Sequence, residues 1–380
     1  MFTAYVERHR TLGWMGAEAG ATKQAPRNGA TYTFQTCVEV CAWHPCHRQQ
    51  WCILNVAPMM RGDMLNTTVG PEMINLVVVL GPTASGKTRL GVELARELGG
   101  EIVSADSRQV YRGLDLGAGK DLDEYSSGGS PVAYHLIDIV DLDSEFSVFE
   151  YQQRFFSVFE DLLARTVMPI VVGGSGLYLE AVLNGYRMVD VPADPVLRAD
   201  LEPLSHEALV DRLQALRRVH NTTDLEDRDR LMRAIEIAQY SAQHEPEPGP
   251  DIHPVVLGVR WDREVLRGRI RKRLGERLEE GLIDEVQNLH DAGVSWEKLS
   301  FLGLEYRFVS DFLRGGIKNK NDLRQKLTAA ICRFAKRQET WFRRMERRGT
   351  EIRWLEGGDV DQALQVVADC GGLTNSREGG

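Results

Sequence analysis

The chain has 380 residues, of which 43% are hydrophobic and 27% are charged, and its formal net charge is -9. This length is enough for one large domain or for about two to three ordinary domains with buried cores. No apolar run approaches the roughly 18–20 residues of a membrane-spanning helix, and the composition also excludes a collagen or a long coiled coil.

The first 72 residues (1–72) differ from the rest of the chain because they show no amphipathic period and no run that predicts a packed element. We interpret them as an N-terminal extension of doubtful structure and expect translation to start at Met64 or Met73, with a targeting segment as the alternative. Four cysteines in this extension lack the CxxC spacing of zinc sites, so we expect no metal there. They are Cys37, Cys41, Cys46 and Cys52.

In residues 73–191, short β-rich runs alternate with longer amphipathic runs, which predicts a parallel sheet flanked by helices. The expected strands are Leu76–Leu80, Glu101–Ala105 and Pro169–Val172. The expected helices are Thr88–Leu98, Phe149–Arg165 and Leu177–Leu183. We interpret 73–191 as the first part of an α/β core.

Residues 192–250 read as a helical insertion that ends in the proline-rich loop Glu245–Pro250. Residues 251–357 then complete the core, with a strand at Val255–Val259 and helical stretches at Arg263–Ala292 and Asp322–Arg348. From residue 260 to 350 there are 22 basic and 14 acidic residues, a balance of +8, which is typical of a polyanion-binding region or of solvated helix faces. The tail, 358–380, predicts no element.

The run GPTASGKT matches the phosphate-binding pattern GxxxxGK[ST] and lies between a predicted buried strand and a predicted helix. Its glycines let backbone N–H groups converge on phosphate oxygens, and the helix N-terminus adds a favourable dipole. We expect Lys87 to face the terminal phosphates and Thr88 to ligate Mg²⁺. The predicted phosphate-binding residues are Gly81, Pro82, Thr83, Ala84, Ser85, Gly86, Lys87 and Thr88.

ATPases and small-molecule kinases share such a loop, so the loop alone favours hydrolysis or phosphoryl transfer. Those enzymes also need an apolar strand that ends in an acid. The chain offers only the short run His135–Asp138, because Ile170–Gly174 ends in glycines. The loop therefore predicts a P-loop NTPase-like core without deciding the reaction.

The run SADSRQVYR, at Ser104–Arg112, follows the second predicted strand directly. Together with GPTASGKT it resembles the tRNA dimethylallyltransferases, the isopentenyltransferases that modify the adenine beside the anticodon. Similar blocks follow in the order of that family, and the resemblance covers about Ile74 to Arg348. These blocks are His135–Asp138, Gly173–Tyr178, Asp229–Ala234, Gly281–Val286 and Ala335–Arg343.

The resemblance implies a P-loop core whose helical insertion contacts tRNA. It implies transfer of a dimethylallyl group from dimethylallyl diphosphate to N6 of the adenine at tRNA position 37, with release of diphosphate and with Mg²⁺ as cofactor. We further expect a cytoplasmic monomer whose partners are the tRNA anticodon loop and the prenyl donor, with no membrane contact.

Negative charge builds on the departing diphosphate, and the weakly nucleophilic N6 needs a base. We expect Lys87 to act on the diphosphate, Asp106 to be the base unless it only caps a turn, and Ser175 to assist; Lys120 is a further candidate at the diphosphate. The residues expected at the tRNA are Asp106, Ser107, Arg108, Gln109, Ser175, Asp229, Arg230 and Arg233. For Arg230 and Arg233, ion pairs with Asp227 and Asp229 are the alternative.

Three segments depart from the family pattern. Ser175 replaces a threonine, Gly117–Asp121 reads GAGKD instead of GTAKP, and Gly303–Arg307 reads GLEYR where Gly-Tyr-Lys/Arg-Glu is common. Three alternative functions also stay open: an adenylate isopentenyltransferase, a P-loop kinase or ATPase, and an RNA-binding protein with a structural phosphate loop. The insertion and the basic stretch Ile331–Arg348, which has 7 basic and 2 acidic residues, favour tRNA as the acceptor.

Overall fold

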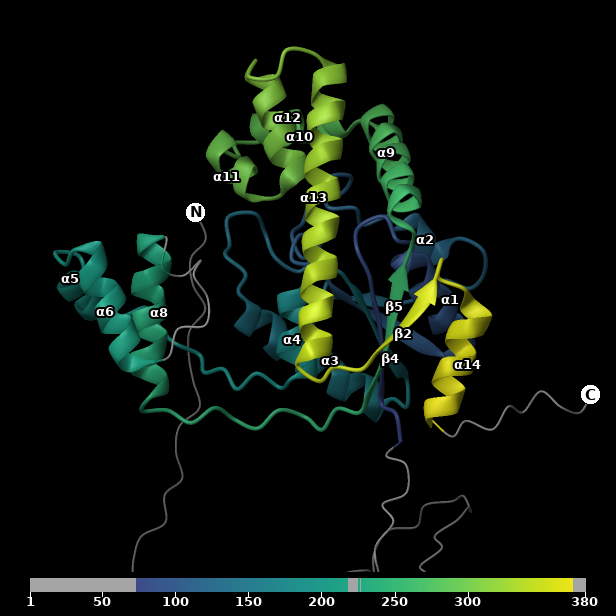
Figure 1. The fold of residues 1–380 in the computed structure, drawn as a ribbon, viewed down its shortest axis with the longest axis horizontal. Helices are drawn as coiled ribbons and strands as arrows, with labels where there is room; N and C mark the ends of the chain where they lie inside the picture. The colour runs from purple at the N-terminus through teal and green to yellow at the C-terminus, as the bar shows by residue number, and fades with distance from the viewer. Residues whose placement is uncertain (1–72, 218–224, 226, 372–380) are drawn as a thin grey trace, which may run out of the picture. The chain divides into compact units, whose positions relative to one another are not determined.

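The computed structural model describes residues 73–217, 225 and 227–371, and the extension with its cysteines lies outside them. Its centre is a six-stranded sheet in the order β3-β2-β4-β1-β5-β6, in which every pair is parallel (Figure 1). This confirms the predicted α/β class. The strands are β1 (Leu76–Leu80), β2 (Gly100–Ala105), β3 (Tyr134–His135), β4 (Met168–Gly173), β5 (Pro254–Arg260) and β6 (Ile352–Glu356).

The central strands are buried on both sides, which explains why they read as continuous apolar runs. All five residues of β1 are buried, and so are the last five of β4. The register pairs Leu80 of β1 and Ala105 of β2 with Gly173 of β4. The loops that follow these three strands therefore leave the sheet at one edge.

Helices cover both faces of the sheet. On one face, α1 (Lys87–Leu98) and α14 (Val360–Gly371) pack on the strands through a shared apolar cluster. On the other face lie α3 (Val148–Ala164), α4 (Gly176–Leu183) and the end of α13 (Lys320–Arg347). In Figure 1, α13 runs from the C-terminal helices down to this second face.

The C-terminal helices form a third apolar cluster with the chain that follows β2. The predicted stretch 263–292 is divided, because Gly281 has φ 108°, a left-handed conformation that ends one helix and begins the next. The tail also contains α14, and the short β3 and β6 were missed. The helices of this region are α9 (Arg263–Glu280), α10 (Leu282–Asp291), α11 (Trp296–Phe301), α12 (Leu304–Leu313) and α13, and α2 (Asp123–Ser126) lies earlier in the chain.

In its described residues the insertion contains α5 (Pro195–Leu201), α6 (His206–Leu216) and α8 (Arg228–Ser241), and it has its own small apolar cluster. Glu236 of α8 is 2% exposed. Its carboxylate accepts hydrogen bonds from Arg198 at 2.7 Å and from Arg233 at 3.0 Å. This buried pairing joins α5 to α8.

In the described part of the chain, no helix is both long enough and apolar enough to span a bilayer.

Replacing Glu236 with Ala should lower the free energy of unfolding of the insertion by about 1–2 kcal/mol, because two partly exposed arginines lose a buried partner. Arg230→Ala, at an exposed position of the same helix, should change it by less than about 0.5 kcal/mol. Denaturant unfolding of both variants measures the difference. Equal stability of the two variants would show that the pairing contributes nothing.

The same pairing should make stability depend on pH. Burial alone would raise the pKa of Glu236, but the hydrogen bonds from Arg198 and Arg233 outweigh it and hold that pKa below its ordinary value of 4.5. A lowered pKa in the folded state stabilises the protein above pH 4.5, and this contribution is lost as the pH falls further. The loss should be absent from Glu236→Ala.

Candidate active site

A cavity of about 340 Å³ opens at the sheet edge where β1, β2 and β4 end. Loops after these strands form one side, and α9, α12 and α13 contribute the other. Open parallel sheets bind ligands at this edge. The structure brings eight of the predicted residues together around it, namely Thr83, Lys87, Thr88, Asp106, Ser107, Arg108, Gln109 and Ser175.

The phosphate loop has the backbone that its sequence predicts. Ala84 and Gly86 have φ of 63° and 92°, the left-handed conformation found in backbone concavities that bind anions. Lys87 then opens α1, whose first N–H groups lack helical partners. The loop is braced from outside by Trp261, which donates to the Ser85 carbonyl at 2.7 Å, and by Arg269, which donates to the Ala84 carbonyl at 2.8 Å.

Gln338 of α13 connects two of the converging loops. Its side-chain oxygen accepts from the Thr83 N–H at 2.9 Å, and its amide nitrogen donates to the Gly174 carbonyl at 3.0 Å. The residue is 8% exposed. One buried amide therefore fixes the phosphate loop against the loop after β4, a role that its position in AKRQETWFR did not indicate.

Lys87 is the cation at the head of the cavity. Burial lowers its pKa to about 8, and the positive charge of Arg273 acts in the same direction, against the carboxylates of Asp106 and Asp121. Arg273 and Arg277 of α9 line the cavity as well. With Arg108, Arg307 and Arg337, six basic side chains line this one small volume, which suits a ligand with several negative charges.

Asp106 follows the last residue of β2. Its Oδ1 accepts from the Arg108 N–H at 2.9 Å, so the turn-cap interpretation describes one of its two oxygens. Within the described part of the chain, Oδ2 has no hydrogen-bond partner. Because the side chain lines the cavity, that oxygen remains available to a ligand.

Ser175 is held beside Asp106 by hydrogen bonds between loops. Its hydroxyl oxygen accepts from the Ser107 N–H at 3.1 Å, and its own N–H donates to the Ala105 carbonyl at 3.2 Å. These contacts need the loops after β2 and β4 to lie side by side. Ser175 is therefore placed to contact the same ligand as Asp106.

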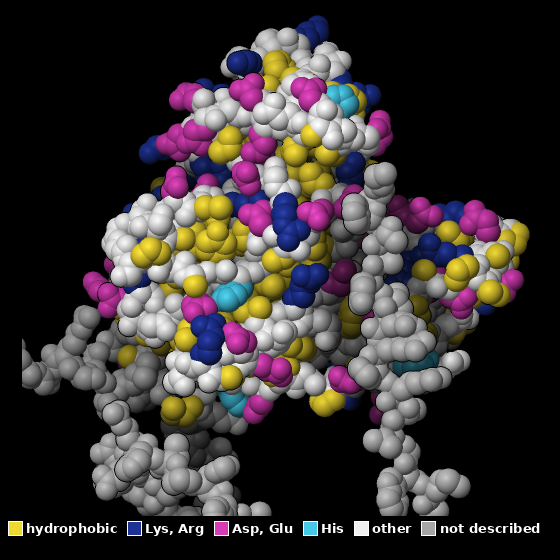
Figure 2. Space-filling view, turned by 180° about the vertical axis from the view of Figure 1, so that it is seen from behind, with side chains coloured by type: hydrophobic (Ala, Val, Ile, Leu, Met, Phe, Trp, Pro, Cys, Tyr) yellow, Lys and Arg dark blue, Asp and Glu magenta, His cyan; other side chains and the backbone are white. Residues whose placement is uncertain are grey.

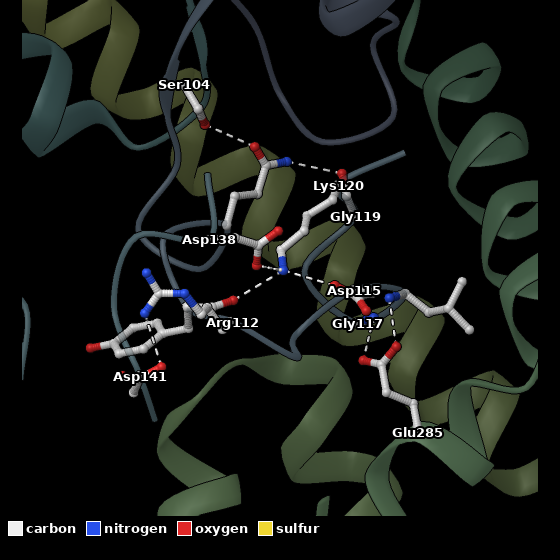
Figure 3. A network of polar contacts seen from close by, with 12 residues as sticks. Ser104, Arg112, Asp115, Gly117, Gly119, Lys120, Asp138, Asp141 and Glu285 are labelled. Atoms are coloured by element: carbon white, nitrogen blue, oxygen red, sulfur yellow. Dashed lines mark hydrogen bonds and ion pairs between the residues drawn. The ribbon is translucent and has the colours of Figure 1, made fainter. Parts of the chain in front are cut away.

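Gln109 lines the cavity, but both ends of its amide already have protein partners. Its oxygen accepts from Ser104 at 2.8 Å, and its nitrogen donates to the Gly119 carbonyl at 2.9 Å (Figure 3). The side chain thus ties β2 to the loop that contains Gly119. Reading a base with this amide would require one of these bonds to break.

Lys120 does not reach the cavity, so its predicted role at the diphosphate is wrong. Its side chain is 1% exposed, and its ammonium group donates to Asp138, to Asp115 at 2.8 Å and to the Tyr111 carbonyl at 3.0 Å (Figure 3). The same contacts occupy Asp138, the one acid that the sequence offered to an ATPase. Lys120 and Asp138 therefore fix the loop 115–121 from the side that faces away from the cavity.

Glu285 of α10 also holds the loop 115–121. Its carboxylate accepts from the Leu116 N–H at 2.7 Å, from the Gly117 N–H at 3.2 Å and from the Tyr306 hydroxyl at 2.7 Å. A Cβ on Gly117 would come within 2.4 Å of the Tyr306 ring, so glycine is needed there for close packing. Tyr306 belongs to the divergent GLEYR segment, which is therefore part of the wall of the site.

The second departure, Asp121, contacts the arginines of the cavity. It pairs with Arg273 and, at 3.0 Å, with Arg277. Burial would raise the pKa of Asp121, but the two guanidinium groups outweigh it and lower that pKa. Sequence reasoning missed both arginines, although their spacing of four residues in α9 places them on one face of the helix.

The predicted tRNA-binding residues of the insertion do not line the cavity. They are Asp229, Arg230 and Arg233. The Asp227 carboxylate caps α8 by accepting from the Arg230 backbone N–H at 3.0 Å. Arg233 pairs with Glu236 instead of with Asp229, and it also donates to the Val191 carbonyl at 2.6 Å. The contact of Asp229, Arg230 and Arg233 with tRNA stays a prediction.

Comparison with known proteins agrees with this architecture. A family model described as IPP transferase matches residues 109–345, and one described as isopentenyl transferase matches residues 74–133. The chain is 59% identical over 294 residues to tRNA dimethylallyltransferase 1 of Syntrophus aciditrophicus, covering 76% of this chain and 96% of that protein. It is 60% identical over 297 residues to tRNA dimethylallyltransferase 2 of Syntrophotalea carbinolica, covering 77% and 98%.

Solved structures extend the likeness to three dimensions. The tRNA isopentenylpyrophosphate transferase of Bacillus halodurans is 32% identical, with a TM-score of 0.56 over 79% of this chain and 98% of that one. A eukaryotic dimethylallyltransferase acting on tRNA, at 22% identity and a TM-score of 0.63, shares the fold. On these matches, the chain belongs to the IPP transferase family, the family of the tRNA dimethylallyltransferases.

Proposed function

We propose that this protein transfers the dimethylallyl group of dimethylallyl diphosphate to N6 of the adenine at position 37 of tRNA, releasing diphosphate, and that it acts as a cytoplasmic monomer. The observation that supports this reaction is the shared cavity. The phosphate loop, six basic side chains and a carboxylate oxygen of Asp106 that has no partner among the described residues line the same 340 Å³. The diphosphate of the donor needs the phosphate loop and its cations, and the amine of the acceptor needs the carboxylate.

At the donor end, the chain stabilises the leaving group. Cleavage of the C–O bond moves negative charge onto the diphosphate, and the loop N–H groups and Lys87 act on that charge without reorganising. Arg273 and Arg277, held by Asp121, add to the positive field. Diphosphate in turn favours the protonated form of Lys87, whose pKa in the free protein is about 8.

The residues beside the phosphate loop fit Mg²⁺. Thr88 and Glu124 line a second cavity, of about 310 Å³, that shares Lys87 with the first. The Oε2 atom of Glu124 is buried without a hydrogen-bond partner in the described residues, and burial raises the pKa of this carboxyl. Mg²⁺ prefers a few protein oxygens together with substrate phosphates, and when bound it would offset charge on the diphosphate.

At the acceptor end, Asp106 takes the proton. The lone pair of N6 is delocalised into the ring, so removal of an N6 proton during attack assists the reaction. Oδ2 of Asp106 accepts this proton while Oδ1 keeps the turn in place. An adenine stacked in the anticodon loop has to leave the stack to enter such a cavity.

One assay tests the proposal: purified protein with labelled dimethylallyl diphosphate and either unmodified tRNA or AMP, with and without Mg²⁺. Label should pass to tRNA, and chelation of Mg²⁺ should slow the transfer. Transfer to AMP alone would make the protein an adenylate isopentenyltransferase. Rapid phosphate release from ATP without either acceptor would support a kinase or ATPase, an interpretation that the pairing of Asp138 with Lys120 weakens.

Replacing Lys87 with Ala should slow transfer by about 10²–10³-fold, the usual effect of removing one preorganised charge partner of a transition state. Binding of inorganic pyrophosphate to the native protein should weaken as the pH rises above about 8, because Lys87 then loses its proton. Calorimetric titration at several pH values measures this, and the variant should lack the pH dependence. Arg89→Ala, two residues along α1 and paired with Glu93, is the control and should behave like the native protein.

Asp106→Asn should reduce the single-turnover rate by about 10²–10⁴-fold while tRNA binding stays within a few fold, because the amide keeps the shape but cannot take the proton. The amide oxygen can still accept from the Arg108 N–H, so the turn survives.

Asp106→Ala loses both contacts and separates the two roles. If Asp106 were only a turn cap, the Asn variant would react at the native rate and the Ala variant alone would be slow. Equal, severe loss in both variants, with tRNA still bound, supports the assignment as the base.

A further inference from the structure

A groove of about 860 Å³ lies between α9 and α13, outside the candidate active site. Its floor is apolar and includes Leu266, Ile270 and Cys332. Its walls carry seven basic side chains and one acidic side chain, that of Glu339. The basic residues are Arg263, Arg267, Arg271, Arg324, Arg333, Lys336 and Arg343. We call this feature the basic groove.

Most of these charges are not neutralised within the protein. Arg267 pairs with Glu264, and Arg343 donates to the backbone carbonyl of Glu339. Among the residues that the structure describes, the side chains of the other five have no hydrogen-bond or ion-pair partner. Like charges that face each other across a groove repel, and a bound anion relieves this repulsion.

This concentration is local. The whole chain has a net charge of -9, whereas the basic groove has a balance of seven positive to one negative side chain. On the side of the molecule opposite to that of Figure 1, acidic and basic side chains are intermixed (Figure 2). Solvated helix faces would be expected to look like that intermixed surface.

The shape indicates a polymer. From Arg324 to Arg343 the wall formed by α13 extends for about 28 Å, at about 1.5 Å per residue. A single phosphate would occupy one or two of these positions, whereas a chain of phosphates can contact them in succession. Six of the seven basic residues are arginines, whose planar fork binds phosphate oxygens in pairs.

The basic groove and the active-site cavity share helix α13. Arg333 and Lys336 face the groove, whereas Phe334, Arg337 and Gln338 line the cavity. One helix, about 10–12 Å wide with its side chains, separates the two. A strand that delivers a base to the cavity therefore needs only to cross α13 to reach the groove.

From these observations we infer that the basic groove binds the phosphate backbone of the tRNA substrate, on the far side of α13 from the base that reacts. This inference rests on the proposed function, because it takes tRNA as the acceptor. It adds a contact surface separate from the cavity and from the helical insertion.

The test compares two triple variants of equal charge. The groove variant is Arg271→Gln, Arg333→Gln and Lys336→Gln, at three exposed residues with no protein partner among the described residues. The control variant is Lys318→Gln, Lys320→Gln and Arg347→Gln, at three exposed basic residues outside the groove. Binding of an unmodified tRNA transcript is measured by filter binding from about 50 to 200 mM salt, without prenyl donor.

The groove variant should bind tRNA at least about tenfold more weakly at low salt, and the slope of log affinity against log salt should fall by about 2–3, the equivalent of three phosphate contacts. Binding of inorganic pyrophosphate should be unchanged in both variants. If the groove variant has the same tRNA affinity and salt slope as the control variant, the inference is overturned. It is also overturned if the groove variant loses binding to polyglutamate, a polyanion without phosphate groups, but keeps its binding to tRNA. Native protein that binds tRNA in this way without transferring label would refute the proposed function and leave the groove contact standing.

Discussion

The register of the parallel sheet is the constraint on which the site depends. Leu80, Ala105 and Gly173 end their strands at one level, and a Cβ on Gly173 would come within 2.2 Å of the Ala105 carbonyl oxygen. Any residue other than glycine would separate β2 from β4 at that point. Because the strands stay in contact to their ends, Ser175 can accept from the Ser107 N–H and thereby lies beside Asp106. The phosphate loop and Asp106 thus line one cavity because of a close backbone fit at Gly173, two residues before Ser175.

How far the sequence predicted this site follows from where each residue lies along the chain. The phosphate loop and Asp106 are coded locally, by a buried strand followed by a turn, so their positions were predicted and the structure places them on one cavity. Arg273, Arg277 and Gln338 come from helices more than 150 residues later, and no local pattern connects them with the loop. Lys120 shows the converse error: a lysine near a phosphate motif suggests a phosphate contact, but its neighbours Asp115 and Asp138 hold it inside the protein.

Two of the three departures from the family pattern fall on one side of the cavity. Asp121 brings a carboxylate to Arg273 and Arg277, and Gly303–Arg307 supplies Tyr306, which donates to Glu285. Both changes act on the loop 115–121, the first through α9 and the second through α10. Burial also raises the pKa of Glu305, which lines the cavity from the same segment. These two departures therefore lie in one wall of the cavity, while the phosphate loop and Asp106 keep the family's residues.

Electrostatic strain in the free protein is part of how such a site selects its ligand. Burial lowers the pKa of both Lys87 and Arg273; the charge of Arg273 lowers that of Lys87 further, and the charge of Arg277 lowers that of Arg273. Asp121 relieves some of this repulsion, but its carboxylate is shared between two arginines and does not contact Lys87. A ligand with a single negative charge leaves part of the excess positive charge unbalanced, whereas a diphosphate balances more of it. The same argument holds for the basic groove on a larger scale, where repulsion along α9 and α13 favours a chain of phosphates over isolated anions.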